Sequence, residues 1–184
     1  MLYIMRHGKT DWNELHKLQG RMDIPLNDNG IDMARSAAEE YKDIHFDICY
    51  CSPLTRARQT AQLVLANRAD KVPVVIDDRL MEMGFGEYEG VQDYLNIPDC
   101  NVNELFFNPE GYIPDKGAES LDELFARTGD FLESIVYPLL SKGKDILIVG
   151  HGAMNSSIIC QVRNRTYKHF WDEGIENCKL KRLL

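Results

Sequence analysis

The chain has 184 residues, of which 44% are hydrophobic and 27% are charged, and its formal net charge at pH 7 is -8. This length fits one domain and is large enough to bury a substantial core. The acidic balance argues against a general nucleic-acid-binding protein, because such proteins carry a basic patch or stripe. Any site for an anion must therefore be built locally from a few cations.

The five cysteines form no Cys-x-x-Cys pair and show no spacing typical of zinc sites, so we expect reduced thiols. Met1 runs directly into an apolar segment, which leaves no room for a secretory signal. No window approaches the roughly 18 apolar residues of a membrane span. These features predict a cytoplasmic protein with no membrane partner, and nothing in the sequence indicates its oligomeric state.

Short apolar segments alternate with helical patterns along the chain. Strands are expected at residues 2–5, 46–51, 74–76 and 145–149, with an edge strand within 175–184. Helices are expected at about 31–41, 54–66, 120–136 and 153–162, the third opening on a capping-box pattern at Ser120 and ending near Pro138. Cys49 and Cys51 are expected to face the same side of their strand. This alternation predicts an α/β fold in three layers, a mainly parallel sheet with helices on both faces.

Residues 91–117 show no long periodic pattern. An irregular stretch of this length inside a compact domain is typically a functional lid or a binding loop. We therefore expect a single domain over residues 1–184, in which 91–117 form a substrate lid or insertion. The sequence leaves open whether short helices form within that segment.

Two of the predicted strands end in a His-Gly step, at His7-Gly8 and at His151-Gly152. The carboxyl ends of parallel strands meet at one edge of a sheet, where open α/β sheets hold their ligands. We therefore expect the two histidines to be neighbours despite their separation in the sequence. Gly8 allows a sharp turn and the close approach of an anion.

Three further charged residues are expected at the same edge. Arg6 precedes His7, Arg56 lies in the first turn of the helix after the second strand, and Glu82 lies on a glycine-bounded loop. Guanidinium groups match phosphate oxygens with paired hydrogen bonds. Two histidines, two arginines and a carboxylate at one edge predict phosphoryl transfer.

Two other interpretations of these residues are weaker. Gly8-Lys9-Thr10 resembles the end of a P-loop, but that motif needs a glycine five residues earlier, where Tyr3 stands. His7, His151 and Glu82 also form a ligand set that suits zinc. Two flanking arginines would repel that cation.

Four segments, taken together, resemble the histidine phosphatase superfamily, the phosphoglycerate-mutase-like enzymes, in the branch with the Arg-His-Gly signature. The resemblance covers nearly the whole chain, and its segments are Arg6-His7-Gly8, Ser52-Pro53-Leu54-x-Arg56-Ala57-x-x-Thr60-Ala61, Leu80-x-Glu82-Met83-x-Phe85-Gly86-x-x-Glu89-Gly90 and Val149-Gly150-His151-Gly152.

The resemblance implies a role for each residue. His7 would be the nucleophile that forms a phosphohistidine, Glu82 would be the proton donor, and the phosphate pocket would contain Arg6, Arg56 and His151. It also implies substrate-binding positions at Thr10, Asn13, Gly20 and Gly152, and no metal or organic cofactor. Arg56 could instead pair with a carboxylate, Asn13 could be a turn former, and Glu87 or Glu89 could be the acid.

The composition of residues 91–117 bears on the choice between phosphatase and mutase. By resemblance, mutases carry a longer insertion there, rich in cations that bind a second acidic group. This segment has four aromatic residues and one basic residue, Lys116, which favours a phosphatase for a less anionic, partly apolar phosphomonoester. Residues 85–90 resemble phosphatases that act on α-ribazole phosphate, a pattern that broad-specificity members share. The expected partner is a small phosphorylated metabolite; mutase activity and a non-catalytic phospho-ligand-binding module remain the alternatives.

Overall fold

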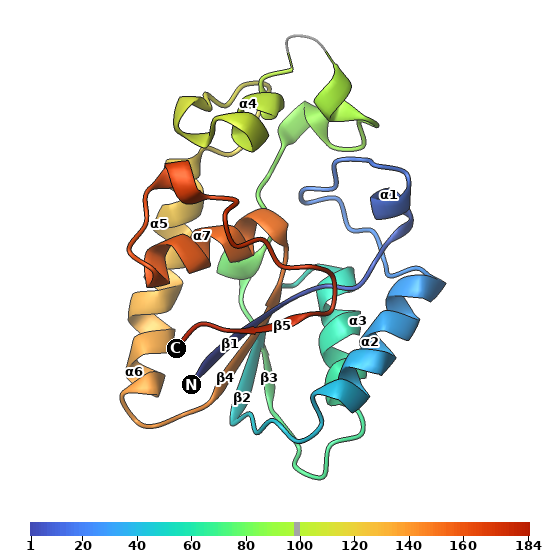
Figure 1. Ribbon diagram of the computed structural model, residues 1–184, viewed down its shortest axis with the longest axis vertical. Coiled ribbons are helices and arrows are strands. Elements are labelled where there is room, and N and C mark those ends of the chain that lie inside the picture. Colours follow the sequence, from blue (N-terminus) through green and yellow to red (C-terminus); the bar gives the residue numbers. More distant parts are fainter. Residues whose placement is uncertain (98–99) are drawn as a thin grey trace.

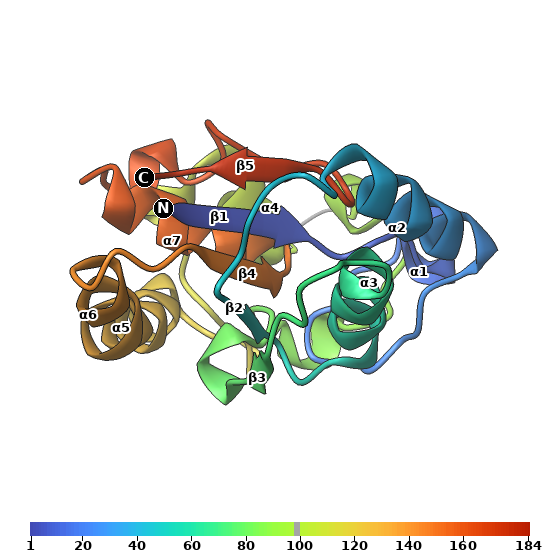
Figure 2. The same ribbon diagram turned by 90° about the horizontal axis from the view of Figure 1, so that it is seen from below.

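The computed structural model describes residues 1–97 and 100–184, and its centre is a five-stranded sheet in the order β3-β2-β4-β1-β5. Figure 2 shows this order across the sheet. The first four strands are parallel and β5 is antiparallel to β1, which confirms the predicted mainly parallel sheet. The strands are β1 (Leu2–Arg6), β2 (Ile48–Cys51), β3 (Val74–Ile76), β4 (Ile146–Gly150) and β5 (Leu180–Arg182).

Helices cover both faces of the sheet, as predicted, and produce three layers (Figure 1). One face packs against α2 (Asp28–Glu40) and α3 (Thr55–Leu65), and the other against α5 (Leu121–Phe131) and α7 (Gly152–Val162). Alternate residues of β1, β2 and β4 enter the two cores, as the pleat of a strand requires. Cys49 and Cys51 lie in the core under α2 and α3, and burial raises the pKa of the Cys51 thiol to about 12.

Side-chain caps mark the starts of α2 and α5. The side chain of Asn27 accepts a hydrogen bond from the Gly30 backbone N–H at the start of α2. Ser120 and Glu123 form the predicted capping box at the start of α5. These polar groups satisfy backbone donors that have no partner within the helix.

The prediction that the helix from residue 120 ends near Val136 is wrong. After α5 the chain continues through a π-helical turn at Leu132–Val136 into α6 (Tyr137–Leu140), so Pro138 lies inside the helical segment. Proline has no N–H to donate, and its ring clashes with a carbonyl of the preceding turn. The wider π turn accommodates this proline without ending the helix.

Residues 91–117 contain short helical elements: a 3-10 turn at Tyr94–Asn96, α4 (Val102–Phe107) and a 3-10 turn at Pro109–Gly111. Buried side chains from this segment join the core under α5 and α7. Figure 1 shows α4 and its surroundings beyond one end of the sheet. The other short elements are α1 (Asp11–Glu14) and 3-10 turns at 78–80, 86–88 and 167–169. Across the described ranges, no helix has the length and apolar character needed to cross a membrane.

Candidate active site

The two histidines of the His-Gly steps lie side by side at the carboxyl ends of β1 and β4. Arg6 pairs with Gly150 in the register of the two strands, and the His7 backbone N–H donates to the Gly150 carbonyl over 2.9 Å. The centroids of the two imidazole rings are 5.1 Å apart. The parallel pairing therefore brings together the two histidines that the strand pattern predicted to be neighbours.

The hydrogen bonds of His7 fix its tautomer. Its Nδ1 atom lies 2.7 Å from the carbonyl oxygen of Gly8, and a carbonyl can only accept. Nδ1 therefore carries the proton, and Nε2 keeps its lone pair. Burial, followed by the charges of Arg56 and Arg6, holds the pKa of His7 well below its usual value. The result is a neutral imidazole whose Nε2 can act as a nucleophile.

Arg56 is fully buried and is held by backbone carbonyls rather than by a carboxylate. Its two terminal nitrogens donate to Met22 O and Gly20 O, each over 2.7 Å. Its Nε lies 3.3 Å from His7 Nε2. Burial lowers the pKa of Arg56 to about 10, so the side chain stays charged at neutral pH beside His7.

Two further polar atoms at this edge are buried and have no hydrogen-bond partner within residues 1–97 and 100–184, namely Arg6 Nε and His151 Nδ1. The other ring nitrogen of His151 lies 2.7 Å from the hydroxyl of Ser52. A buried donor without an acceptor is energetically costly. An oxyanion would supply acceptors beside these two residues.

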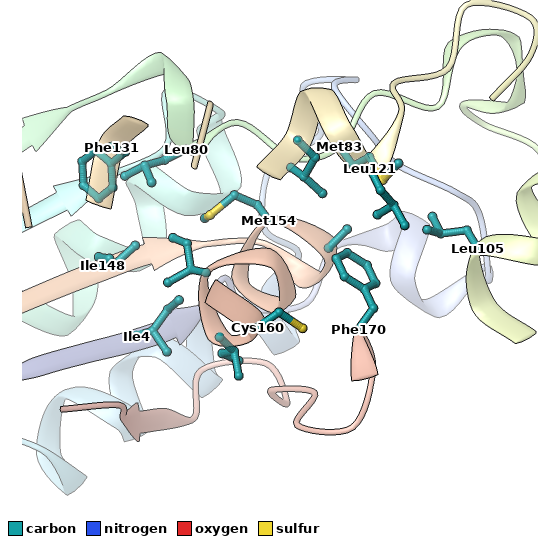
Figure 3. Close-up of a cluster of buried hydrophobic side chains, with 14 of the residues drawn as sticks. Ile4, Leu80, Met83, Leu105, Leu121, Phe131, Ile148, Met154, Cys160 and Phe170 are labelled. Atoms are coloured by element: carbon teal, nitrogen blue, oxygen red, sulfur yellow. The ribbon is translucent and has the colours of Figure 1, made fainter. Parts of the chain in front are cut away.

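The carboxylate of Glu82 is anchored at the start of α7. It accepts hydrogen bonds from the backbone N–H groups of Met83 (2.9 Å), Ala153 (3.3 Å) and Met154 (2.9 Å). Met83 is fully buried near Leu121 in the core under α5 (Figure 3). These contacts hold the carboxylate in one place at the edge of the sheet.

Arg127 of α5 holds the backbone of the same loop. Its guanidinium donates to the carbonyls of Met81 (2.8 Å) and Glu82 (3.2 Å) and forms an ion pair with Glu119. The side chain of Arg127 therefore fixes the backbone that carries Glu82.

The two rival carboxylates of the loop have other surroundings. Glu89 accepts hydrogen bonds from the backbone N–H groups of Arg21, Met22 and Phe85, which ties two loops together. Glu87 is exposed to solvent. Glu82, in contrast, lines the cavity at the strand ends.

That cavity has a volume of about 260 Å³. Most of the residues predicted for the site line it, namely Arg6, His7, Asn13, Gly20, Arg56, Glu82 and Gly152. His151 does not line it but packs against His7.

Thr10 is the predicted substrate-binding residue that the structure keeps away from the cavity. It is fully buried and caps α1, because its hydroxyl accepts from the Asn13 backbone N–H and donates to Gln19. Asn13 serves as a turn residue too, since its side-chain oxygen accepts from the Thr10 backbone N–H over 3.1 Å. The two residues support each other, and Asn13 alone of the pair reaches the cavity.

Several residues of the site were not predicted from the sequence. Arg127 was missed, as were further side chains that line the cavity, namely Lys17, Leu18, Gln19, Phe85, Tyr94, Phe106, Ala153 and Trp171. The segment 17–19 lies between the predicted binders Asn13 and Gly20, and this position was a usable signal. Trp171 follows no motif, and the sequence alone offered no signal for it.

The zinc hypothesis has no support in the structure. Over the two described ranges, no group of three His, Cys, Asp or Glu side chains is arranged to hold a metal ion. His7 instead has a guanidinium nitrogen 3.3 Å from its Nε2. Positive charge at that position suits an anion.

A family model described as histidine phosphatase superfamily (branch 1) matches residues 2–184. The chain belongs to this superfamily. One relative is named "Uncharacterized phosphatase PhoE" from Bacillus subtilis; it is 35% identical over 161 residues, with 86% of this chain and 75% of the relative covered. Another is a 2,3-bisphosphoglycerate-dependent phosphoglycerate mutase from Methylobacterium, 32% identical over 160 residues, with 83% and 75% covered.

Solved structures of phosphatases share the fold. The alpha-ribazole phosphatase of Shigella flexneri superposes with a TM-score of 0.79 at 28% identity, over 97% of this chain and 87% of that one. The resemblance predicted from the four motifs is confirmed at the level of the family and the fold. The relatives include both phosphatases and mutases, so the family alone does not decide the reaction.

Proposed function

We propose that the protein is a phosphomonoester hydrolase that acts through a phosphohistidine on His7. The observation that carries this proposal is the hydrogen bond from His7 Nδ1 to the Gly8 carbonyl, which leaves Nε2 as an unprotonated nucleophile in the cavity. The lowered pKa of His7 supports it, because the ring stays neutral at the pH of the reaction.

The surroundings of His7 supply the phosphate pocket. Arg6 Nε and His151 Nδ1 lack partners among the described residues, and phosphoryl oxygens would provide them. Arg56 Nε contacts the lone pair of His7 Nε2, so a bound phosphoryl group takes over this donor and frees the nucleophile. Donors arranged in advance around the phosphorus stabilise the charge that spreads over its oxygens in the transition state.

Two displacement steps complete the reaction. In the first, His7 Nε2 forms a bond to phosphorus, the ester P–O bond breaks, and Glu82 gives a proton to the leaving oxygen. In the second, Glu82 takes a proton from water, the water oxygen bonds to phosphorus, and the N–P bond breaks. Inorganic phosphate leaves and His7 returns to its neutral form.

Among the residues that the structure describes, few cations line the cavity. This favours water, rather than a second phosphorylated acid, as the acceptor of the phosphoryl group. Within the described chain, Lys17 is the one cationic residue besides Arg6 and Arg56 that lines the cavity. Lys116, the single basic residue of the predicted lid at 91–117, lies with its ammonium over the ring of Tyr88 instead. This composition supports phosphatase activity on a small phosphorylated metabolite. Mutase activity remains the second candidate because a mutase is among the relatives.

Phosphate release tests the proposal directly. We expect the purified protein to hydrolyse p-nitrophenyl phosphate, with a rate that a chelator leaves unchanged. A panel with α-ribazole phosphate, sugar phosphates and phosphoglycerate would rank the substrates, and a coupled assay would measure mutase activity. A folded sample that releases no phosphate from any ester would contradict the proposal, and a mutase rate above the hydrolysis rate would favour the second candidate.

A glycine at the start of α7 provides a second test of the site. A Cβ atom on Gly152 would lie 3.6 Å from Glu82 Oε2 and 3.8 Å from Arg6 Cζ, which is ordinary contact without a clash. Gly152→Ala should therefore fold and keep or raise the melting temperature, since alanine favours the helix. The added methyl group narrows the space between the two groups that face the substrate, so we expect kcat/KM to fall about tenfold or more.

The matched control is Gly174→Ala, in the segment after α7, where the nearest atom to an added Cβ is 3.9 Å away. Its kcat/KM should equal that of the wild type. Equal rates for Gly152→Ala and Gly174→Ala would show that Arg6 and Glu82 do not both contact the reacting phosphoryl group.

A further inference from the structure

The cavity that contains His7 also has an aromatic wall, formed by Tyr94, Phe106 and Trp171. The rings of Phe106 and Trp171 are stacked, with centroids 5.2 Å apart and planes 9° from parallel. The ring of Tyr94 lies 5.3 Å from that of Phe106 at an angle of 43°. The three rings form one continuous apolar surface.

This wall is not an ordinary part of the core. All three side chains pack against the core under α5 and α7 but remain only half-buried, whereas Phe131 and Phe170 of that core are 0% and 1% exposed. Because Tyr94, Phe106 and Trp171 line the cavity, part of their remaining apolar surface faces it. When a ligand covers apolar surface that is exposed in a cavity, the burial of that surface makes binding more favourable.

The wall is assembled from two segments that are distant in the sequence. Tyr94 and Phe106 belong to residues 91–117, and Trp171 belongs to the segment after α7. The indole N–H of Trp171 donates to the carbonyl of Leu105 over 2.7 Å, which fixes the ring beside α4. Stacking and this hydrogen bond therefore hold the wall in place before any ligand binds.

Three cations of the described chain line the same cavity as the aromatic wall. Arg6 and Arg56 flank the nucleophile, and the remaining cation, Lys17, lies with its ammonium 5.6 Å from the ring centre of Trp12. A second cavity of about 390 Å³ adjoins the first and shares Asn13, Lys17 and Tyr94 with it. A leaving group that passes Tyr94 therefore has room to extend.

We propose that the aromatic wall is a subsite for the leaving group, and that the preferred substrates are phosphomonoesters of alcohols with an apolar ring. The inference rests on the proposed function, because it assigns the part of the substrate that His7 does not touch. The ring of the alcohol packs against Phe106 and Trp171 while the phosphoryl group lies between Arg6 and Arg56. Aromatic pairs of this kind add to the free energy gained from buried area alone.

Two esters with alcohols of similar acidity test the subsite, 2-phenylethyl phosphate and ethyl phosphate. We expect the wild-type enzyme to prefer the phenylethyl ester by about tenfold or more in kcat/KM, and the corresponding phosphonates, which cannot be hydrolysed, to show the same order of affinity. Phe106→Ala should lower kcat/KM on the phenylethyl ester much more than on ethyl phosphate, and so remove most of the preference. Phe106→Leu provides the same comparison if the alanine variant is unstable.

Phe107→Ala is the matched control, because this neighbouring ring is 72% exposed and does not line the cavity. It should keep the full preference. Turnover of both esters without a preference, or an equal loss on both in Phe106→Ala, would overturn the subsite and leave the proposed function intact. Absence of turnover of both esters would count against the proposed function, and the affinities of the two phosphonates would then decide the subsite alone.

Discussion

Replacement of His7 by alanine is expected to lower kcat/KM for every phosphomonoester by at least about 10⁴-fold, because no other group can take its place as the nucleophile. The side chain is 2% exposed, and its bond to Gly8 fixes the one ring nitrogen that can attack. Initial rates on p-nitrophenyl phosphate measure the loss. A melting curve shows whether the variant is folded, since the substitution also leaves a small void.

His45→Ala is the control for this substitution, because the side chain of His45 is 57% exposed and lies outside the cavity. It should retain the wild-type rate. Rapid quenching of the wild-type reaction should also give an acid-labile phosphate on the peptide that contains residue 7, and none in His7→Ala. Phosphate found on another residue, or a folded His7→Ala variant with more than about one per cent of the activity, would contradict the role of His7.

Replacement of Glu82 by glutamine is expected to separate substrates by their leaving groups. An alkoxide needs a proton as it departs, so kcat/KM on alkyl phosphates should fall about 10²- to 10³-fold. Nitrophenolate is a stable anion, and the loss on p-nitrophenyl phosphate should be about tenfold or less. Glutamine keeps the size of the side chain and one oxygen acceptor for the backbone N–H groups of Met83 and Met154.

The matched control is Glu87→Gln, on the same loop but exposed to solvent. We expect its rates on both classes of ester to equal those of the wild type. Equal losses on alkyl and aryl esters in Glu82→Gln would show that Glu82 positions the substrate rather than protonating it. A loss in Glu87→Gln that depends on the leaving group would move the acid role to that residue.

The sheet and the neighbouring histidines could be predicted from the sequence because they depend on local patterns and one topological rule. Apolar runs at residues 2–5 and 145–149 identify buried strands, and parallel pairing places His7 and His151 together. The continuation of the helix through Pro138 could not be predicted. The π turn that accommodates the proline has no recognisable pattern in the sequence.

Residues that act through tertiary contacts could not be predicted from the sequence either. Arg127 holds the Glu82 loop from α5, and Trp171 reaches the cavity from the segment after α7. Thr10 illustrates the opposite case. The resemblance to the family implied a substrate contact there, whereas in the structure its hydroxyl forms hydrogen bonds with Asn13 and Gln19 and does not line the cavity.

The position of β1 has a consequence for how the protein is made. This strand, which ends one residue before His7, lies between β4 and β5, so both of its partners are translated long after it. The apolar residues of β1 therefore stay unpaired on the ribosome until residues 146–150 have emerged, and pairings this distant in sequence form slowly. During that interval the nascent chain presents an uncovered strand to chaperones and to other nascent chains, and His7 and His151 come together only after β4 has emerged.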